Sequence, residues 1–344
     1  MNLDKRERLI MTESLTCSAQ NNYCLIDLCK FVCSLFVVGI HCNVFVNNAV
    51  MNDFITQGLF RLAIPLFYTI SGFLFSAKVH RNGVAALIKQ ERKLVIVYMI
   101  WSAVYFVESV CKSLFLRETI GLELFKKYAW NMVFRASKYH LWYLLALIYA
   151  LPLFYFLITK VKIRFQIAAI GLLWLIQCFA FSYHFFAPEF GGAVFTLSQT
   201  IDAIWNTFFC AIPLLLVGNL INHFSSNGNQ HKKLFFLIVS FLLIIEKMMI
   251  VIVLKSPANA HFLLFMPLFA FFLVLVLAQS TIEIKYSIYL RKASLLMYCV
   301  HPLIIDFLLV NNISYGMLCF LIVSSALIIL TLSFFCVKEK IKCF

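Results

Sequence analysis

The chain has 344 residues, of which 63% are hydrophobic and 13% charged, and its mean hydropathy is +0.92. This composition excludes an ordinary soluble globular protein, and the continuous apolar runs indicate membrane-spanning helices, not alternating barrel strands. The net charge of +14 lies mostly in short segments between apolar runs, where topology and anionic headgroups explain it without nucleic acid. The twelve cysteines form no CxxC pair or zinc-ligand spacing, so no metal site is expected.

We predict an all-α membrane protein with about ten transmembrane helices, because apolar stretches long enough to cross a core of about 30 Å recur along the chain. The expected spans cover residues 25–45, 57–77, 94–111, 140–159, 166–186, 201–221, 234–254, 261–279, 293–311 and 316–336. Residues 1–20 form a short polar cytoplasmic tail, and residues 21–344 form one membrane domain. No cleavable signal is expected, because the first apolar segment has full span length and no small-residue cleavage site follows it.

The charge distribution predicts that both termini are cytoplasmic. An even number of spans puts both termini on one side, and most of the Lys and Arg residues between spans then fall on that side. The segment 112–139 is the exception, because it is basic and lies on the outer side. Its apolar residues, which include Leu122, Phe125 and Trp130, recur at mixed helical spacings, so we expect an interfacial helix along the outer surface.

The first span contains polar residues that lipid does not solvate. Lys30 and His41 are eleven residues apart, within about 20° of three full helical turns, so they share one face roughly 16 Å apart along the axis. Asp27 lies one turn before Lys30 and can pair with it. A topology-setting pair at the inner boundary explains Asp27 and Lys30 equally well. His41 lies at membrane depth without a local charged partner, which favours a functional role.

The second span brings an arginine to the depth of the first-span histidine. The short segment 47–56 makes the two spans neighbours, and Arg61 enters near the outer face. We therefore expect a neutral imidazole base, His41, and the Arg61 cation to share one site. Snorkelling of Arg61 to headgroups is the alternative explanation. Further along the span, Ser71 and Gly72 permit a close helix–helix contact.

Later spans carry further candidates. His140 and Trp142 open the fourth span, where Trp is expected in the aromatic belt and His140 is either a belt residue or a substrate ligand. His301 lies at the middle of the ninth span, and Glu246 lies at the middle of the seventh beside Lys247. Ionisable side chains at this depth face the bundle interior and mark functional sites by default.

Four stretches resemble, in order and spacing, the acyltransferase-3 family of bacterial membrane O-acyltransferases: IDLCKFVCSLFVVGIH, RLAIPLFYTISGFLF, YHLWYLLALIYALP and SLLMYCVHPLII. The resemblance covers residues 21–336. It implies a ten-span bundle that moves an acyl group, usually acetyl, from cytoplasmic acyl-CoA to a hydroxyl of a cell-surface or lipid-linked carbohydrate. In that family the first motif is a basic residue, ten intervening residues and a histidine, which maps onto Lys30 and His41. The family often has arginine at the first place, so Lys30 is a departure.

The resemblance and the charge pattern together suggest a mechanism. The other motifs map onto Arg61, Ser71, Gly72, His140, Trp142, His301 and Pro302. His41 is expected to act as general base on the acceptor hydroxyl, and Arg61 to stabilise the oxyanion or a phosphate of the acceptor. The residues expected to bind substrate are Lys30, Ser71, His140, Trp142, Glu246 and His301.

We expect two basic segments, 78–93 and 112–139, to bind different substrates on opposite sides of the membrane. A short cytoplasmic loop is expected to hold the phosphates of coenzyme A, with its pantetheine arm entering between the first two spans. The loop residues are Lys78, Arg81, Lys89, Arg92 and Lys93. A topology determinant is the simpler explanation of that loop. On the outer side, the segment 112–139 and His140 are expected to hold an anionic acceptor.

Two other functions fit the same polar residues. Buried His, Arg and Glu would serve a transporter or flippase of a small polar or glycolipid substrate, although no matching pair of broken spans points to one. A sensory or structural membrane domain is the third possibility. For the acyltransferase we expect the bacterial cytoplasmic membrane, acyl-CoA as donor substrate, no permanently bound cofactor and no nucleic acid. The acceptor, the acyl group and the oligomeric state stay open.

Overall fold

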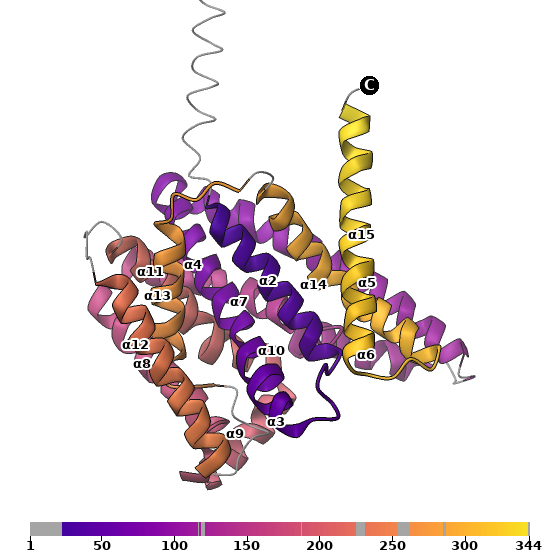
Figure 1. The fold of residues 1–344 in the computed structure, drawn as a ribbon, viewed down its shortest axis with the longest axis horizontal. Helices are drawn as coiled ribbons and strands as arrows, with labels where there is room; N and C mark the ends of the chain where they lie inside the picture. The colour runs from indigo at the N-terminus through magenta and orange to yellow at the C-terminus, as the bar shows by residue number, and fades with distance from the viewer. Residues whose placement is uncertain are drawn as a thin grey trace, which may run out of the picture.

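The computed structural model describes residues 23–115, 117, 121–186, 188–224, 231–253, 262–284 and 287–342. Every regular element in these ranges is helical, which confirms the predicted all-α class. The helices in Figure 1 are α2 (Cys24–His41), α3 (Ala49–Met51), α4 (Ala63–Asn82), α5 (Val84–Phe115), α6 (Leu122–Phe134), α7 (Trp142–Lys160), α8 (Ile163–Ala180), α9 (Pro188–Thr200), α10 (Asp202–Asn206), α11 (Ile212–Phe224), α12 (Lys232–Met248), α13 (Met266–Ala278), α14 (Ser287–Val310) and α15 (Met317–Lys342). The π-helical segments are η1 (Asn52–Leu59), η4 (Thr207–Ala211) and η5 (Met249–Val253), and the 3₁₀ segments are η2 (Phe60–Leu62) and η3 (His184–Phe186).

Eight helical segments of the described chain are long and apolar enough to cross a membrane. They are Cys24–His41, Ala49–Asn82, Val84–Phe115, Trp142–Lys160, Ile163–Ala180, Asp202–Phe224, Lys232–Ile252 and Ser287–Val310, and each overlaps a predicted span. The predicted spans 261–279 and 316–336 overlap two shorter apolar helices, Met266–Ala278 and Met317–Ser333. The chain is therefore a multi-pass membrane protein. The count of ten crossings and the cytoplasmic termini stay predictions, and the polar tail 1–20 lies outside the described residues.

A close crossing of α4 and α11 forms the centre of the bundle. A Cβ atom on Gly72 would lie 2.2 Å from the backbone oxygen of Leu215, and one on Gly218 would lie 2.2 Å from the backbone oxygen of Thr69. Real Cβ atoms do not approach backbone this closely, so only glycine allows the two helices to touch here. The close contact predicted at Ser71 and Gly72 is thus confirmed, and it fixes the position of α4.

Helices α2 and α14 run parallel beside each other, as Figure 1 shows. The Asp27 carboxylate accepts hydrogen bonds from Arg291 at 2.8 and 2.7 Å, and Ser294 Oγ donates to the backbone oxygen of Lys30 at 3.1 Å. The expected pairing of Asp27 with Lys30 is therefore wrong, because Asp27 forms its ion pair across the helix interface. The parallel packing brings His41, at the end of α2, beside His301 in the middle of α14, with ring centroids 5.2 Å apart.

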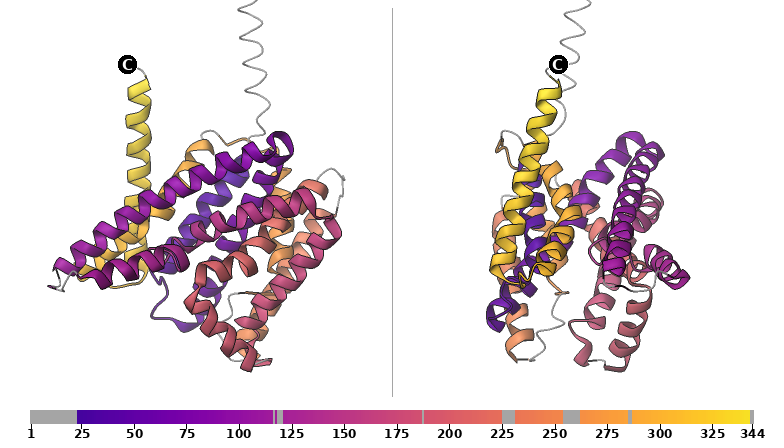
Figure 2. Two further views of the ribbon diagram at one scale, coloured as in Figure 1. Left: turned by 180° about the vertical axis from the view of Figure 1, so that it is seen from behind. Right: turned by 90° about the vertical axis from the view of Figure 1, so that its right-hand side faces the viewer.

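The basic segment 78–93 is a helical hairpin with no extended loop. Helix α4 continues to Asn82, Gly83 turns the chain with a φ of +54°, and α5 begins at Val84. A positive φ is a conformation that glycine adopts at little cost. Figure 2 shows α5 as a long helix on the outside of the bundle and α15 beside the bundle, extending past it toward the C-terminus. The basic side chains therefore project from two rigid helices.

The outer segment 112–139 contains the helix that its sequence predicts. Helix α6 exposes Leu122, Phe125 and Trp130, while two tyrosines tie this region to α5. Tyr98 donates to the backbone oxygen of Met132 at 2.6 Å, and Tyr128 donates to the backbone oxygen of Ser102. Its helical nature is thus confirmed, and its place along the membrane surface stays a prediction. Helix α9 was not predicted as a separate element.

Candidate functional site

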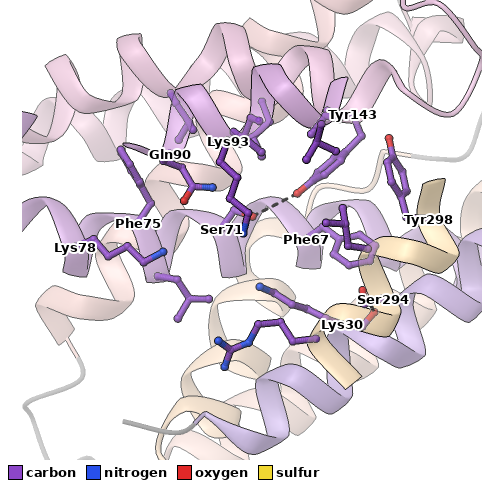
Figure 3. A pocket seen from close by; sticks show the side chains of 18 residues that line it. Lys30, Phe67, Ser71, Phe75, Lys78, Gln90, Lys93, Tyr143, Ser294 and Tyr298 are labelled. Carbon is purple, nitrogen blue, oxygen red and sulfur yellow. Dashed lines mark hydrogen bonds between the residues drawn. The ribbon is translucent and has the colours of Figure 1, made fainter. Parts of the chain in front are cut away.

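Four basic side chains line one cavity of about 320 Å³. They are Lys30 of α2, Lys78 of α4, Lys93 of α5 and Arg291 of α14, and no acidic side chain is among the described residues that line the cavity. Figure 3 shows Lys30, Lys78 and Lys93 reaching into this space from three helices. The cavity lies at the end of the bundle where α2 and α14 begin, which we name the Lys30 end. Its charge suits a polyanion.

The inner part of the cavity is apolar and closes on a pair of tyrosines. Phe67, Leu147 and other apolar side chains form its walls. Ser71 Oγ and the Tyr143 hydroxyl share a hydrogen bond of 3.3 Å there, which Figure 3 marks, and Tyr298 lies beside them. The Tyr298 hydroxyl donates to the backbone oxygen of His140. A charged mouth thus leads to an apolar pocket that ends near His140.

A separate cleft of about 480 Å³ opens near the other end of α2, which we name the His41 end. Its lining residues are Ile40, His41, Asn43, Asn52, Gln57, Arg61, Tyr139 and Tyr315. The π-helical η1 carries Asn52 and Gln57, and π-helical turns are frequent at functional sites. Gln57 Oε1 accepts a hydrogen bond of 3.1 Å from Arg61 Nε. The predicted meeting of His41 and Arg61 therefore occurs, in a polar cleft.

Three histidine rings lie between the cavity and the cleft. The ring centroids of His41 and His301 are 5.2 Å apart, those of His301 and His140 are 5.1 Å apart, and His140 lies 5.4 Å from the Tyr298 ring. His140 and His301 are fully buried, whereas His41 is half-buried and reaches the cleft. These rings form a continuous path from Tyr298 in the cavity to His41 in the cleft, which we name the histidine path.

The histidine path contains unused hydrogen-bonding nitrogens. His301 Nδ1 lies 3.0 Å from the backbone oxygen of Met297, and a carbonyl only accepts, so Nδ1 carries the proton of the neutral ring and Nε2 carries the lone pair. Within the described chain, His301 Nε2 has no hydrogen-bond partner, and the His140 ring has at most one contact, with the backbone of Cys299, so at least one of its nitrogens is unused. Buried polar atoms without partners are costly and typical of catalytic sites, so this path is the best candidate for chemistry.

An ion-pair network holds the segment that carries His140. Lys138 Nζ lies 2.9 Å from Glu108 Oε2 and 2.7 Å from Asp306 Oδ2, joining α5 to α14. Burial lowers the pKa of Lys138, but its hydrogen bonds to Asp306 and Glu108 outweigh burial and raise it above the ordinary 10.5. With both carboxylates ionised, the contribution of the Lys138 charge is therefore fully present up to pH 10.5 and is lost as pH rises through the higher folded pKa. Two carboxylates already neutralise Lys138, which removes it from the predicted acceptor-binding charges.

Replacing Lys138 with methionine should destabilise the protein by about 1–3 kcal/mol and slow acyl transfer, because two partly buried carboxylates lose their cation and the His140 segment loosens. Thermal unfolding of the purified protein and transfer rates measure the two effects. Lys126→Met is the matched control, since Lys126 pairs with Glu123 on the exposed surface and its loss should cost less than about 0.5 kcal/mol. Equal behaviour of the two variants would refute a positioning role for Lys138.

The other predicted residues fall into two groups. Lys30 and Ser71 line the cavity, and Trp142 packs half-buried beside it in the core. Arg81, Lys89 and Arg92 are exposed and do not line either hollow. We retain only Lys78 and Lys93 of the basic segment as candidate ligands of a polyanion.

Glu246 lies in neither hollow. Its carboxylate accepts hydrogen bonds from the backbone nitrogens of Leu264 and Phe265 and from the Tyr183 hydroxyl. The two backbone donors directly precede α13 and Tyr183 follows α8, so the described contacts of Glu246 tie the start of α13 to the end of α8. We therefore leave Glu246 out of the proposed site.

Several lining residues were not singled out from the sequence. Arg291, Tyr143 and Tyr298 in the cavity and Asn52 and Gln57 in the cleft have ordinary sequence surroundings. One signal was available: Arg291 lies two residues before the predicted span that contains His301 and ten residues before that histidine, much as Lys30 precedes His41.

The family comparison matches residues 25–337 to the acyltransferase-3 family, described as an acyltransferase domain. The chain is also 26% identical over 221 residues to an amino-acid racemase of Enterococcus faecalis, an alignment that covers 62% of this chain and 29% of the racemase. Because the chain spans less than a third of that relative, the racemase name describes that protein alone. No solved structure matches the chain. With a family match over nearly its whole length and membrane-spanning helices, the chain belongs to the acyltransferase-3 family of membrane acyltransferases.

Proposed function

We propose that this membrane acyltransferase moves a short acyl group, such as acetyl, from acyl-CoA in the cavity to a hydroxyl of an acceptor in the cleft. The observation that carries the proposal is the histidine path, which joins a basic hollow at the Lys30 end to a polar hollow at the His41 end. The donor can thus bind in the cavity and the acceptor in the cleft, and their reacting groups can approach each other along the histidine path. The acceptor class we propose is a cell-surface or lipid-linked carbohydrate at a bacterial cytoplasmic membrane.

The cavity supports acyl-CoA as donor. Lys78, Lys93, Lys30 and Arg291 offer charge-assisted hydrogen bonds to phosphate oxygens at the mouth, and the apolar inner walls suit a pantetheine arm. The volume of about 320 Å³ lies near the lower end of small-molecule pockets, so it favours a short acyl group beside the arm. The nucleotide then stays at the charged mouth, outside the apolar part.

The chemistry assigns the base role to His41. Its ring takes the proton from the acceptor hydroxyl, the hydroxyl oxygen attacks the thioester carbonyl, and the C–S bond breaks as the ester forms. The proton returns to the departing thiolate, so coenzyme A leaves as the thiol. Positioned bases of this kind contribute about 10²–10⁴-fold. Arg61 contributes positive charge on the acceptor side of this reaction.

The function is tested with purified protein in lipid nanodiscs, radiolabelled acetyl-CoA and an envelope fraction as acceptor. Label that moves into a glycan or glycolipid only with the protein present supports the proposal. Absence of transfer, together with acyl-CoA-independent uptake of a polar solute by vesicles, would replace it with the transporter alternative.

The double variant Lys78→Gln/Lys93→Gln should raise the KM for acetyl-CoA by about tenfold or more and change kcat less, because it removes two charged ligands of the phosphates. The matched control is Lys89→Gln/Arg92→Gln, which removes two charges from the same helical hairpin at exposed positions outside the cavity. Steady-state kinetics compare the two pairs. An equal rise in KM for both would mean that the segment acts only through its overall charge.

A further inference from the structure

The guanidinium of Arg61 lines the cleft without a counter-ion. Its Nε donates to Gln57 Oε1 at 3.1 Å, and among the described residues it makes no further hydrogen bond and no ion pair. Lys247 Nζ donates to the backbone oxygen of the same Gln57 at 3.2 Å. Two cations thus flank Gln57.

An uncompensated cation inside a membrane protein is costly. Withdrawing a charge from water is unfavourable unless a counter-charge and hydrogen bonds replace the solvent. The hydrogen bond from Nε to Gln57 orients the guanidinium plane. The two terminal nitrogens of Arg61 are then available to a second hydrogen-bond acceptor. Their fork geometry matches a phosphate or a carboxylate. Arg61 is half-buried at the wall of the cleft, so an anionic ligand bound there could supply the missing charge.

A second residue of the same cleft also lacks a partner. The side-chain oxygen of Asn52 is buried and makes no hydrogen bond in the described structure, although Asn52 lines the cleft. Buried amide oxygens are rarely left unpaired, and a hydroxyl donor of a ligand would satisfy this one. The cleft thus offers a site for an anion at Arg61, a site for a hydroxyl at Asn52 and a base at His41.

We propose that the acceptor is a hydroxylated molecule that carries its own oxyanion, a phosphate or a carboxylate, and that Arg61 binds this group. The anion fixes the molecule in the cleft so that a hydroxyl lies against His41. This inference rests on the proposed function and narrows its acceptor class from any carbohydrate to an anionic one. A neutral sugar would leave the Arg61 charge uncompensated and should bind poorly.

Binding can be tested without turnover. Purified protein is first saturated with coenzyme A, which fills the basic cavity, and isothermal titration calorimetry then measures glucose 6-phosphate, glucuronate and glucose as probes. We expect at least one of the two anions to bind at least about tenfold more tightly than glucose, and Arg61→Gln to abolish that difference. Arg61→Lys should bind the preferred anion more weakly than wild type and more tightly than Arg61→Gln, because lysine keeps the positive charge and loses the paired guanidinium donors. The two anions also distinguish phosphate from carboxylate as the preferred group.

The remaining outcomes decide against the inference. If glucose binds as well as both anions, if neither anion binds, or if Arg61→Gln keeps the preference, the acceptor site does not select charge. Size-exclusion profiles and unchanged coenzyme A affinity confirm that each Arg61 variant is folded. Lys93→Gln should keep the preference for the anion, because Lys93 lines the donor cavity and not the cleft. Loss of the preference in Lys93→Gln would place the measured site in the donor cavity and contradict the inference. Because no acyl transfer is measured, failure here leaves the radiolabel test of the acyltransferase activity independent.

Discussion

Replacing His41 with alanine should lower acyl transfer by about 10²–10⁴-fold while leaving the amount of folded protein unchanged. His41 is the member of the histidine path that lines the cleft, so it alone among the three rings can touch an acceptor there. It stands at the end of α2 and is half-buried, so its removal creates no large cavity in the core. Transfer from radiolabelled acetyl-CoA measures the effect.

The His41 result has two checks. Added imidazole should restore part of the activity of His41→Ala, because the open cleft has room for a free base. His231→Ala is the control, since His231 is exposed just before α12 and lines neither hollow. Near-normal transfer by His41→Ala would remove this residue from the chemistry and leave His301 or His140 as the base.

Replacing Gly218 with leucine should prevent accumulation of folded protein. A Cβ atom at this position would lie 2.2 Å from the oxygen of Thr69 and 2.5 Å from the nitrogen of Phe73, and both are backbone atoms of α4 that no rotamer change can move. The helices would have to separate across the most buried part of the bundle, at an expected cost of about 3 kcal/mol or more. Folded yield by size exclusion and thermal unfolding measure the loss.

Gly171→Leu is the matched control for the helix crossing. Gly171 also lies inside an apolar helix, α8, but nothing stands within 4 Å of the position of its Cβ atom. This variant should fold at least as well as the wild type, because leucine has a higher helix propensity than glycine. If Gly218→Leu also accumulates with wild-type thermal stability, the α4–α11 contact is looser than the structure shows.

Helical periodicity allowed the site to be predicted in part. The shared face of Lys30 and His41 follows from the repeat of one helix, and the short connection between the first two spans brought Arg61 to the same depth. The structure adds that Lys30 and His41 line different hollows, at opposite ends of α2. The shared helix face determines that both side chains point the same way, and the distance along the helix places Lys30 at the donor cavity and His41 at the acceptor cleft.

Contacts between distant segments could not be predicted in the same way. Asp27 lies one turn from Lys30, yet its carboxylate binds Arg291, because α14 packs beside α2. Glu246 shows the same limit: its depth in the span indicated function, while its hydrogen bonds are to backbone nitrogens that precede α13. Each partner choice depends on which helices become neighbours, and a single sequence with local rules does not determine that.

The glycine crossing has a consequence for how substrates enter. Because backbone contact at the two glycines holds α4 against α11, the wall that carries Ser71 and Lys78 should stay in place, and most of the apolar residues of Asp202–Phe224 behind it are buried. The opposite wall is α5, which carries Lys93 and has few buried residues. Widening of the charged mouth to seat the nucleotide should therefore come from tilting of α5 about the Gly83 turn, while α4 stays in place.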